Sequence, residues 1–312
     1  IPGGLGVHQN ANVRAIKIRN PPPARNLTVM PLPFYDAIYE LLEPQELPSS
    51  DNFKSKFKVG VYCQLALSPE QHAKLSTDEA LFPRVEVQLR FFNTTGDIRD
   101  IEQEDAFPPK CAVTLNDLPV TLPDVIPTER GVERKRPSRP VNITQLVANS
   151  PRDKPLRIRI KWKADERKWA VAVYLVECVN AEILSNRIVK SPAFELPYVT
   201  TEDIIRKRLN GDDDDDISMD SIKISLLCPL TKTRMSIPTR SRDCTHVQCF
   251  DLDAFLMMNQ QKPSWKCVVC TNPAPYHRLI IDKYFMKMLE DLRSTITDVE
   301  LLKDGSYRAI KE

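Results

Sequence analysis

The sequence predicts a multidomain protein of mixed β and α+β class, with a β-rich domain followed by a smaller metal-binding module. Three observations support this fold class. A length of 312 residues predicts about two domains. Apolar and polar residues alternate with a period of two over much of the first two thirds of the chain, and Cys and His residues cluster in the last third. The composition, 42% hydrophobic and 28% charged, is that of ordinary folded protein.

Charge and hydropathy exclude several classes. A net charge of +2 argues against a protein whose whole surface binds nucleic acid. No apolar run approaches the ~20 residues that a membrane span needs, so no membrane partner is expected. Five of the eight cysteines lie close together and near a histidine, which favours metal binding over disulfides and a reducing compartment. Because the sequence begins at Ile1 rather than Met, we expect it to be part of a longer chain.

Residues 1–26 show no periodicity and end in Asn20-Pro-Pro-Pro-Ala-Arg25, so an extended N-terminal arm is expected. A β-domain is then predicted over 27–199. Its apolar positions alternate in four stretches, near residues 59–67, 85–91, 156–162 and 169–175. The last two flank a polar turn and predict a hairpin, and the whole pattern predicts a compact antiparallel β-sandwich or barrel. Cys63 shares the apolar side of its strand and is expected to be an inert core thiol.

A linker helix followed by an acidic run is predicted over 200–220. Thr200-Thr-Glu-Asp203 places a hydroxyl and then acids in the first helical turn, and Gly211 ends the helix. Asp212–Asp216 is a run of five carboxylates that repel one another. The run is expected to be a solvated linker, with docking to a basic partner as the lesser alternative.

The metal ligands predicted from spacing are Cys244, His246, Cys267 and Cys270. Two short chelating pairs, Cys-x-His and Cys-x-x-Cys, are separated by twenty residues, which is enough for a helix over 251–259. Zinc requires four such soft or borderline ligands in a tetrahedron. Since all four ligands come from the protein, the ion is expected to be structural and to keep no open position for water.

The same region follows the ligand order of a RING module, which binds two zinc ions through alternating pairs. The pairs above fill the second RING site. In the first site Cys228 and Cys249 are present, but the other two positions hold Thr231 and Leu252. Two thiols cannot complete a tetrahedron, so the sequence predicts a single-zinc RING-like module in which packing and hydrogen bonds replace the other ion.

After Cys270 the chain is expected to form a C-terminal helical extension over 273–312. Apolar residues recur there at spacings of three and four, which predicts an amphipathic helix packed on the metal module. They are Ile281, Tyr284, Phe285, Met288, Leu289 and Leu292.

Taken together, these motifs resemble a known family. Ser225-Leu-Leu-Cys228-Pro-Leu230, Thr233-Arg-Met-Ser-Ile-Pro238, Cys244-Thr-His-Val-Gln-Cys-Phe-Asp251 and Trp265-Lys-Cys-Val-Val-Cys270 are similar to the SP-RING of the PIAS/Siz ligases for the small modifier SUMO. The module spans 221–272. Upstream, Lys135-Arg-Pro-Ser-Arg-Pro-Val-Asn-Ile-Thr144 resembles the PINIT motif, with Val141 in place of Ile. The family's DNA-binding SAP domain is missing from this sequence, so any DNA contact is expected through that absent N-terminal domain.

The resemblance implies a SUMO ligase that acts as a scaffold. It would bind the SUMO-conjugating enzyme charged with SUMO as a thioester, and a substrate lysine would attack that thioester directly, so no ligase residue is catalytic. The resemblance also implies that one structural zinc ion shapes the module. Positions matching the conjugating-enzyme contacts of RING modules are Leu230 and Val268, although the family usually has Pro at the latter. Trp265 is expected to pack against the module.

SUMO itself is expected to contact Val299, Leu301 and Leu302 in the apolar run Thr297–Leu302, which can add as a strand to the edge of a ubiquitin-like modifier. The alternative is an ordinary strand of the C-terminal fold. The basic segment Arg134-Lys-Arg-Pro-Ser-Arg139 fits a nuclear address, a nucleic-acid contact or a solvated loop. The family resemblance favours nuclear localisation and nuclear substrate proteins. Two other functions stay open: a non-catalytic zinc-dependent transcriptional co-regulator or adaptor, and ubiquitin ligation.

Overall fold

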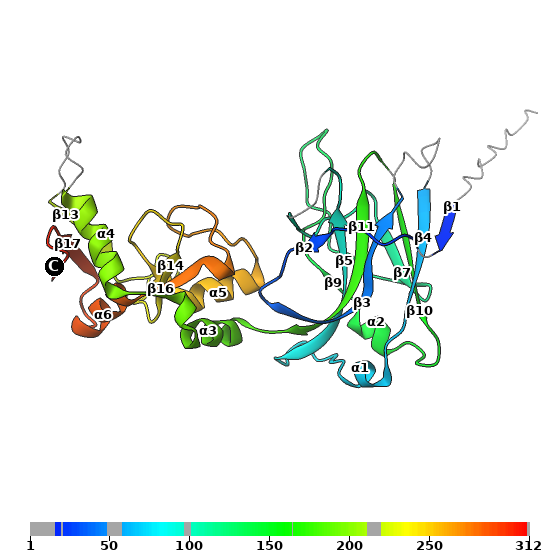
Figure 1. Cartoon of the computed structure of the whole chain (residues 1–312), viewed down its shortest axis with the longest axis horizontal. Coiled ribbons are helices and arrows are strands. Elements are labelled where there is room, and N and C mark those ends of the chain that lie inside the picture. Colours follow the sequence, from blue (N-terminus) through cyan, green and yellow to red (C-terminus); the bar gives the residue numbers. More distant parts are fainter. Residues whose placement is uncertain are drawn as a thin grey trace, which may run out of the picture. The chain divides into compact units, whose positions relative to one another are not determined.

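The computed structural model describes residues 16–19, 21–48, 58–96, 101–163, 165–210 and 220–310. The chain divides into two compact units, Ile1–Cys178 and Val179–Glu312, here called the N-terminal and C-terminal units (Figure 1). The division falls before the predicted domain end at 199. The Asp212–Asp216 run, Gly211 and residues 1–15 of the predicted arm lie outside the described residues. Within that described part, no helix has both the length and the hydrophobicity needed to span a membrane.

The N-terminal unit is a β-sandwich of two sheets, as predicted (Figure 1). One sheet has the order β1-β4-β10-β7-β8, formed by Ile16–Arg19, Lys58–Leu65, Leu156–Lys163, Ala112–Leu115 and Leu118–Pro119. The other has the order β3-β11-β5-β9, formed by Tyr35–Leu47, Trp169–Cys178, Arg84–Asn93 and Val141–Asn142. Two short strands, β2 (Thr28–Val29) and β6 (Glu102–Gln103), pair with each other, and the helices are α1 (Pro69–Ala73) and α2 (Thr144–Ala148).

Side chains from both sheets form one core. Cys63, Ile160 and Trp162 from the first sheet and Leu89 and Val173 from the second are each at most 1% exposed. The inward position of Cys63 confirms its predicted place. Part of the predicted extended arm is not free, because β1 pairs in parallel with β4.

The predicted hairpin of 156–162 with 169–175 is wrong. β10 pairs with β4 and β7, whereas β11 pairs with β3 and β5, so the turn between them passes from one sheet to the other. Alternation shows that each strand has an apolar face but not which strand it pairs with. β11 also buries its second face: Ala170 and Ala172 pack with Phe92 in a smaller cluster.

The outer face of β5 is buried although its residues are polar. Glu86, Gln88 and Arg90 are between 2% and 8% exposed. Arg90 forms a buried ion pair with Asp105, with Nη2 2.9 Å from Oδ2, and also donates to the carbonyl oxygen of Met30 at 3.1 Å. Segments near residues 30 and 105 therefore cover this face at Arg90 and satisfy its charge, while Glu86 pairs with Arg84 of the same strand at 2.7 Å, so both buried charges have partners.

In its described residues the C-terminal unit has four α-helices and two small sheets. The helices are α3 (Ala181–Lys190), α4 (Tyr198–Asn210), α5 (Leu252–Gln261) and α6 (Lys283–Asp291). One sheet has the order β12-β16-β14-β15, from Glu195–Leu196, Leu279–Asp282, Pro238–Ser241 and Phe250–Asp251, and the other has the order β13-β17-β18, from Ser221–Ser225, Asp298–Leu302 and Tyr307–Ala309. The helices predicted near 200 and over 251–259 correspond to α4 and α5. The predicted C-terminal helix is α6, but Ile281 belongs to strand β16 instead, and the extension also contains β17 and β18.

Candidate metal centre and its surroundings

The four predicted ligands come together in the C-terminal unit. The ligand atoms of Cys244, His246, Cys267 and Cys270 all lie within 4.8 Å of one another. With Zn–S distances of about 2.3 Å, two sulfur ligands of a tetrahedral zinc lie about 3.8 Å apart. The sulfurs of Cys244 and Cys270 are 3.8 Å apart, and His246 Nε2 is 3.3 Å from the Cys267 sulfur. Three thiols and an imidazole at this spacing fit zinc.

The backbone around the ligands fixes their orientation. His246 Nδ1 lies 2.9 Å from the carbonyl oxygen of Gln248, and a proton donated there leaves Nε2 free for the metal. The amide of Val269 donates to the Cys267 sulfur at 3.4 Å. Such outer contacts select the tautomer and hold the ligands in place.

Burial disfavours the thiolate form of Cys244 in this pocket. Burial, together with the neighbouring thiol of Cys267, raises the pKa of the Cys244 thiol to about 12. Burial also lowers the pKa of His246, which favours the neutral imidazole that binds metals. Zinc would supply the positive charge that stabilises thiolates at this buried position.

Two polar residues that the sequence did not single out support the site. Asn259 is fully buried in α5, and its Oδ1 accepts from the amides of Ser264 at 2.9 Å and Trp265 at 2.8 Å. It thus holds the loop that enters the Cys267 pair. The side-chain amide of Gln248 bonds the backbone of Ser225 twice: its Oε1 accepts from the Ser225 amide at 2.9 Å, and its Nε2 donates to the Ser225 carbonyl oxygen at 2.8 Å. The pair of bonds resembles those between neighbouring strands. The sequence offered one signal for each: Asn259 is an uncharged polar residue in a largely apolar helix, and Gln248 is one within the metal-binding motif.

No second group of metal ligands lies among the described residues. At the position of the first RING site, Cys228 and Cys249 are fully buried, and so is Leu252. The Cys228 sulfur accepts from the amide of Asp251 at 3.3 Å, while the hydroxyls of Thr231 and Thr233 lie 2.8 Å apart. Packing and hydrogen bonds thus occupy this region, and the number of zinc ions stays a prediction.

The two predicted docking residues, Leu230 and Val268, are both half-buried, which leaves part of each side chain accessible. Exposed apolar residues occur beside them in the sequence and on α5: Val269 is 38% exposed and Met257 is 57% exposed. Trp265 packs edge-on against Phe255 and Tyr276, with centroid distances of 6.1 and 6.3 Å, which confirms the packing role predicted for it. The docking assignments themselves stay predictions.

Residues 297–302 do not present a free strand. β17 is the central strand of its sheet, paired with β13 on one side and β18 on the other, and Val299 and Leu301 are fully buried. The predicted addition of this strand to a modifier's sheet therefore does not fit the structure, because its backbone groups are already paired. Leu302 is half-buried. Contact between this sheet and SUMO stays a prediction, with β13 and β18 as the edges.

A buried polar cluster joins three elements of the C-terminal unit. Asp282 is fully buried between β16 and α6, and its Oδ2 accepts from the Thr201 hydroxyl at 2.7 Å and from Arg240 Nε at 3.3 Å. Its Oδ1 caps α6 by accepting from the amides of Tyr284 and Phe285 at 3.0 and 3.3 Å. One carboxylate thus connects α4, β14 and α6.

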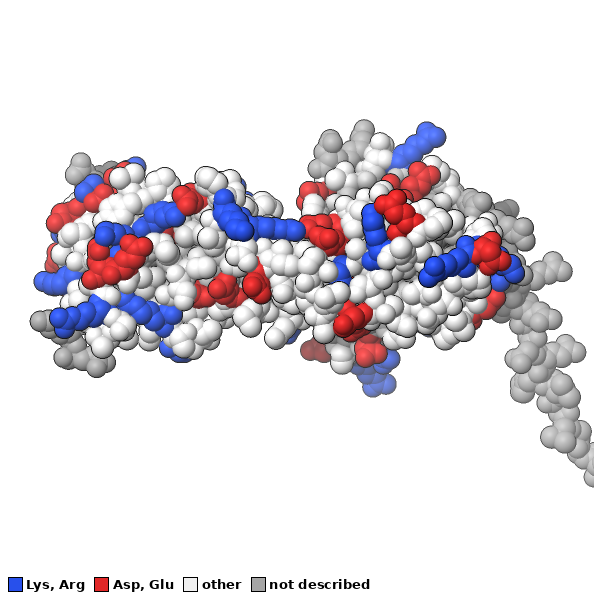
Figure 2. Space-filling model, turned by 90° about the horizontal axis from the view of Figure 1, so that it is seen from below, with Lys and Arg blue, Asp and Glu red and all other residues white. Residues whose placement is uncertain are grey.

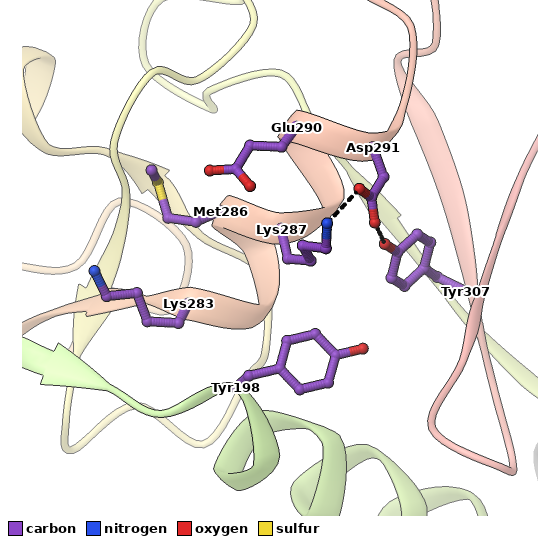
Figure 3. Close-up of a pocket in the computed structure, with 7 residues that line it drawn as sticks. All are labelled: Tyr198, Lys283, Met286, Lys287, Glu290, Asp291 and Tyr307. Atoms are coloured by element: carbon purple, nitrogen blue, oxygen red, sulfur yellow. Dashed lines mark hydrogen bonds and ion pairs between the residues drawn. The ribbon is translucent and has the colours of Figure 1, made fainter.

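A pocket of about 440 Å³ lies against the exposed side of α6, bounded by Tyr198 and Tyr307 (Figure 3). The Lys287 ammonium is 2.7 Å from Asp291 Oδ1, and the Tyr307 hydroxyl donates to Oδ2 of the same carboxylate at 2.7 Å. Lys283 pairs with Glu195. The pocket thus lies where α4, α6 and β18 meet, and Lys283, Lys287 and Asp291 in its wall each have an ion-pair partner.

Comparisons with known proteins agree with this architecture. The family model described as PINIT domain matches residues 26–177, and the one described as MIZ/SP-RING zinc finger matches residues 224–273. The chain is 45% identical over 292 residues to the E3 SUMO-protein ligase gei-17 of Caenorhabditis elegans, and 36% identical over 296 residues to the E3 SUMO-protein ligase PIAS4-A of Danio rerio. These alignments cover 93% and 94% of this chain but only 37% and 57% of the relatives.

The fold also matches a solved structure. The crystal structure of the S. cerevisiae SUMO E3 ligase SIZ1 aligns with a TM-score of 0.67 and 20% identity, covering 99% of both chains. At this identity the match supports the fold alone. The sequence matches, the fold and the Cys/His cluster all lead to one assignment: the chain belongs to the PIAS/Siz family, which combines a PINIT domain with an SP-RING zinc finger.

Proposed function

We propose that this chain is the ligase core of a SUMO-protein ligase. The observation that carries the proposal is the four-ligand site within a family-matched SP-RING, together with relatives that are named E3 SUMO-protein ligases. In this proposal the SP-RING binds the SUMO-conjugating enzyme while that enzyme carries SUMO as a thioester. A substrate lysine attacks the thioester, so no covalent intermediate forms on the ligase.

The chain's contribution is geometric. The Leu230 loop and the Cys267–Cys270 loop form the two parts of the docking surface, and zinc holds the second of them. Holding thioester and lysine in a near-attack arrangement can supply several kcal/mol of the activation barrier, roughly 7–11 kcal/mol for the best intramolecular cases. One structural zinc ion is proposed, held by Cys244, His246, Cys267 and Cys270, with packing around Cys228 in place of a second ion.

Several wider properties belong to the same proposal. The protein acts in the nucleus on nuclear substrates, and the PINIT domain contributes to substrate choice. The family resemblance and the basic segment Arg134–Arg139 support this location. The alternative is a non-catalytic zinc-dependent co-regulator with the same fold. A ligase would speed the discharge of the thioester on the bound conjugating enzyme, whereas a co-regulator would leave the rate unchanged.

The test is a reconstituted discharge assay with purified conjugating enzyme, run once with SUMO and once with ubiquitin. The wild-type chain should accelerate SUMO transfer to lysine and leave ubiquitin transfer unchanged. Leu230→Ala should lose the stimulation while retaining zinc and its amide spectrum. Val199→Ala, which removes an apolar side chain that is 58% exposed on α4, is the matched control and should retain stimulation. An active Leu230→Ala variant would refute the docking assignment, and a chain that binds the charged enzyme without speeding discharge would support the co-regulator.

A further inference from the structure

The outer face of β10 carries a row of cations that the proposed ligase function does not use. Arg157, Arg159, Lys161 and Lys163 alternate with the buried residues of this strand. All four therefore point to the same side of the sheet, away from the core. Successive members of the row are about 6.8 Å apart, twice the rise of a strand residue.

The neighbouring strands leave this face open and add an aromatic ring. Tyr62 of β4 lies directly opposite Arg159, whose guanidinium carbon is 5.7 Å from the centre of its ring. On the other side β7 contributes Thr114 and Ala112 opposite Arg159 and Lys161. The side chain of Arg157 is 62% exposed, and both lysines are exposed.

One acid partly balances the row. Asp117, after β7, pairs with Arg157 at 3.5 Å and with Arg159. Lys161 and Lys163 have no ion pair within the described ranges, so the half of the row nearer residue 163 has uncompensated positive charge. Figure 2 shows one face of the chain, on which basic and acidic side chains are interspersed.

The basic segment that begins at Arg134 lies near the same end of β10. Glu133, the residue before it, accepts from the guanidinium of Arg167 at 2.9 and 2.6 Å, and Arg167 follows β10 by a few residues. Arg134 and Lys135 are exposed there. Arg134 and Lys135 thus add exposed positive charge near this end of β10, where the acids Glu133 and Asp165 both pair with Arg167.

Two kinds of polyanion could bind this row of cations, an acidic peptide or a nucleic acid, and the position of β10 within its sheet favours the second. β10 is paired on both sides, with β4 and with β7, so an acidic peptide cannot bind by adding as a strand. The face offers only side-chain tips: guanidinium and ammonium groups at regular spacing beside one aromatic ring. That combination matches the phosphate backbone and an unstacked base of a single-stranded nucleic acid.

We propose that the outer face of β10 binds single-stranded nucleic acid without sequence preference, through Arg157, Arg159, Lys161 and Lys163 to phosphates and through Tyr62 to a base. This differs from the expectation that DNA contact would come only from a separate N-terminal domain. It is independent of the ligase proposal, because the face lies in the N-terminal unit. A scaffold that binds nucleic acid in this way would concentrate near substrates that are themselves bound to it.

The test measures fluorescence anisotropy of a labelled oligonucleotide of about 20 nucleotides with the whole chain, over a range of salt. With four phosphate contacts at a slope of about −0.7 each, affinity should fall by about 50-fold between about 50 mM and about 200 mM salt. In the double variant Lys161→Gln with Lys163→Gln, affinity should fall by only about 7-fold over the same salt range, because two phosphate contacts remain. Lys74→Gln with Lys190→Gln changes the same charge at exposed lysines elsewhere and should match the wild type.

Equal salt dependence of the Lys161/Lys163 variant and the control would overturn the proposal, as would the absence of binding at the lowest salt. Tighter binding of the duplex form would contradict the assignment to single strands. A labelled polyglutamate peptide run in parallel should bind weakly. If instead it binds more tightly than the oligonucleotide and depends on Lys161 and Lys163, the partner is an acidic protein and the proposal fails.

Discussion

Replacing Asp282 by alanine should destabilise the C-terminal unit by about 4–6 kcal/mol. The variant leaves Arg240, whose side chain is 4% exposed, without its carboxylate partner, and removing one partner of a buried pair costs about 3–5 kcal/mol. It also removes the cap that accepts from the first amides of α6, which adds about 1 kcal/mol. The Thr201 hydroxyl loses its acceptor at the same time.

Fluorotryptophan NMR can follow this unit separately. The chain has three tryptophans; Trp162 and Trp169 lie in the N-terminal unit and Trp265 in the C-terminal unit. With a urea dependence of about 2 kcal/mol per M, the unfolding midpoint seen by Trp265 should fall by about 2–3 M. The signals of the other two should keep their midpoints, since they report on a different unit.

The matched control is Asp203→Ala, which removes an exposed aspartate of α4 paired with Arg206 at 3.5 Å. Exposed pairs of this kind contribute little, so its midpoint should shift by no more than the equivalent of about 0.5 kcal/mol. Equal shifts for the two variants would refute the reasoning that burial makes the Asp282 cluster important. Arg240→Met combined with Asp282→Leu should recover much of the loss, because it leaves no charge unpaired.

Three further outcomes follow from the structure. Cys267→Ser should lose zinc and unfold the SP-RING, and the wild type should contain one zinc per chain by elemental analysis; two ions per chain would contradict the proposed site. Gly305→Ala should destabilise the C-terminal unit by about 1–3 kcal/mol more than Gly131→Ala destabilises the N-terminal unit, since both glycines have positive φ but only Gly305 would place a Cβ 2.6 Å from a neighbouring side chain; equal losses of stability in the two units would argue against this close approach. Burial raises the pKa of Cys63 and Cys111 from 9.0 to about 12, so the contribution of these neutral thiols to folding stability is complete below about pH 9 and is lost as the pH rises toward 12. The urea midpoint of the N-terminal unit should therefore fall over that range, and it should fall less steeply in a variant with valine at both positions. Identical slopes for the variant and the wild type would exclude these thiols as the cause.

Local patterns predicted the parts of this fold that local physics determines. Period two located the strands, and the inward position of Cys63 followed from it. Two chelating pairs with a helix between them were enough to bring Cys244, His246, Cys267 and Cys270 to one point, because each pair is close in sequence and zinc geometry defines the rest. The twenty residues between the pairs left room for this helix, and the structure shows that Asp251 caps its start by accepting from the amide of Ala254.

What the sequence did not predict depends on contacts between distant segments. β10 and β11 belong to different sheets because each finds its partners elsewhere, and alternation contains no information about partners. The buried polar face of β5 depends on residues near 30 and 105 that cover it. In β17 the apolar pair Val299 and Leu301 was compatible with an edge strand or with a central one, and only its pairing with β13 and β18 decides between these.

The two loops of the proposed docking surface are held by different physical means. The loop with Leu230 is closed by backbone hydrogen bonds, with the Cys228 amide donating to the Thr233 carbonyl at 2.7 Å and the Lys232 amide donating back to Cys228 at 2.8 Å. The adjoining Arg234 donates to the carbonyl oxygens of Leu292 and Ile296, which ties this loop to the C-terminal extension. The loop with Val268 lies between two zinc ligands and depends on the ion. The backbone and the extension therefore hold the Leu230 loop without a metal ion in the proposed single-zinc module, whereas the Val268 loop has only the short chelating pair to hold it.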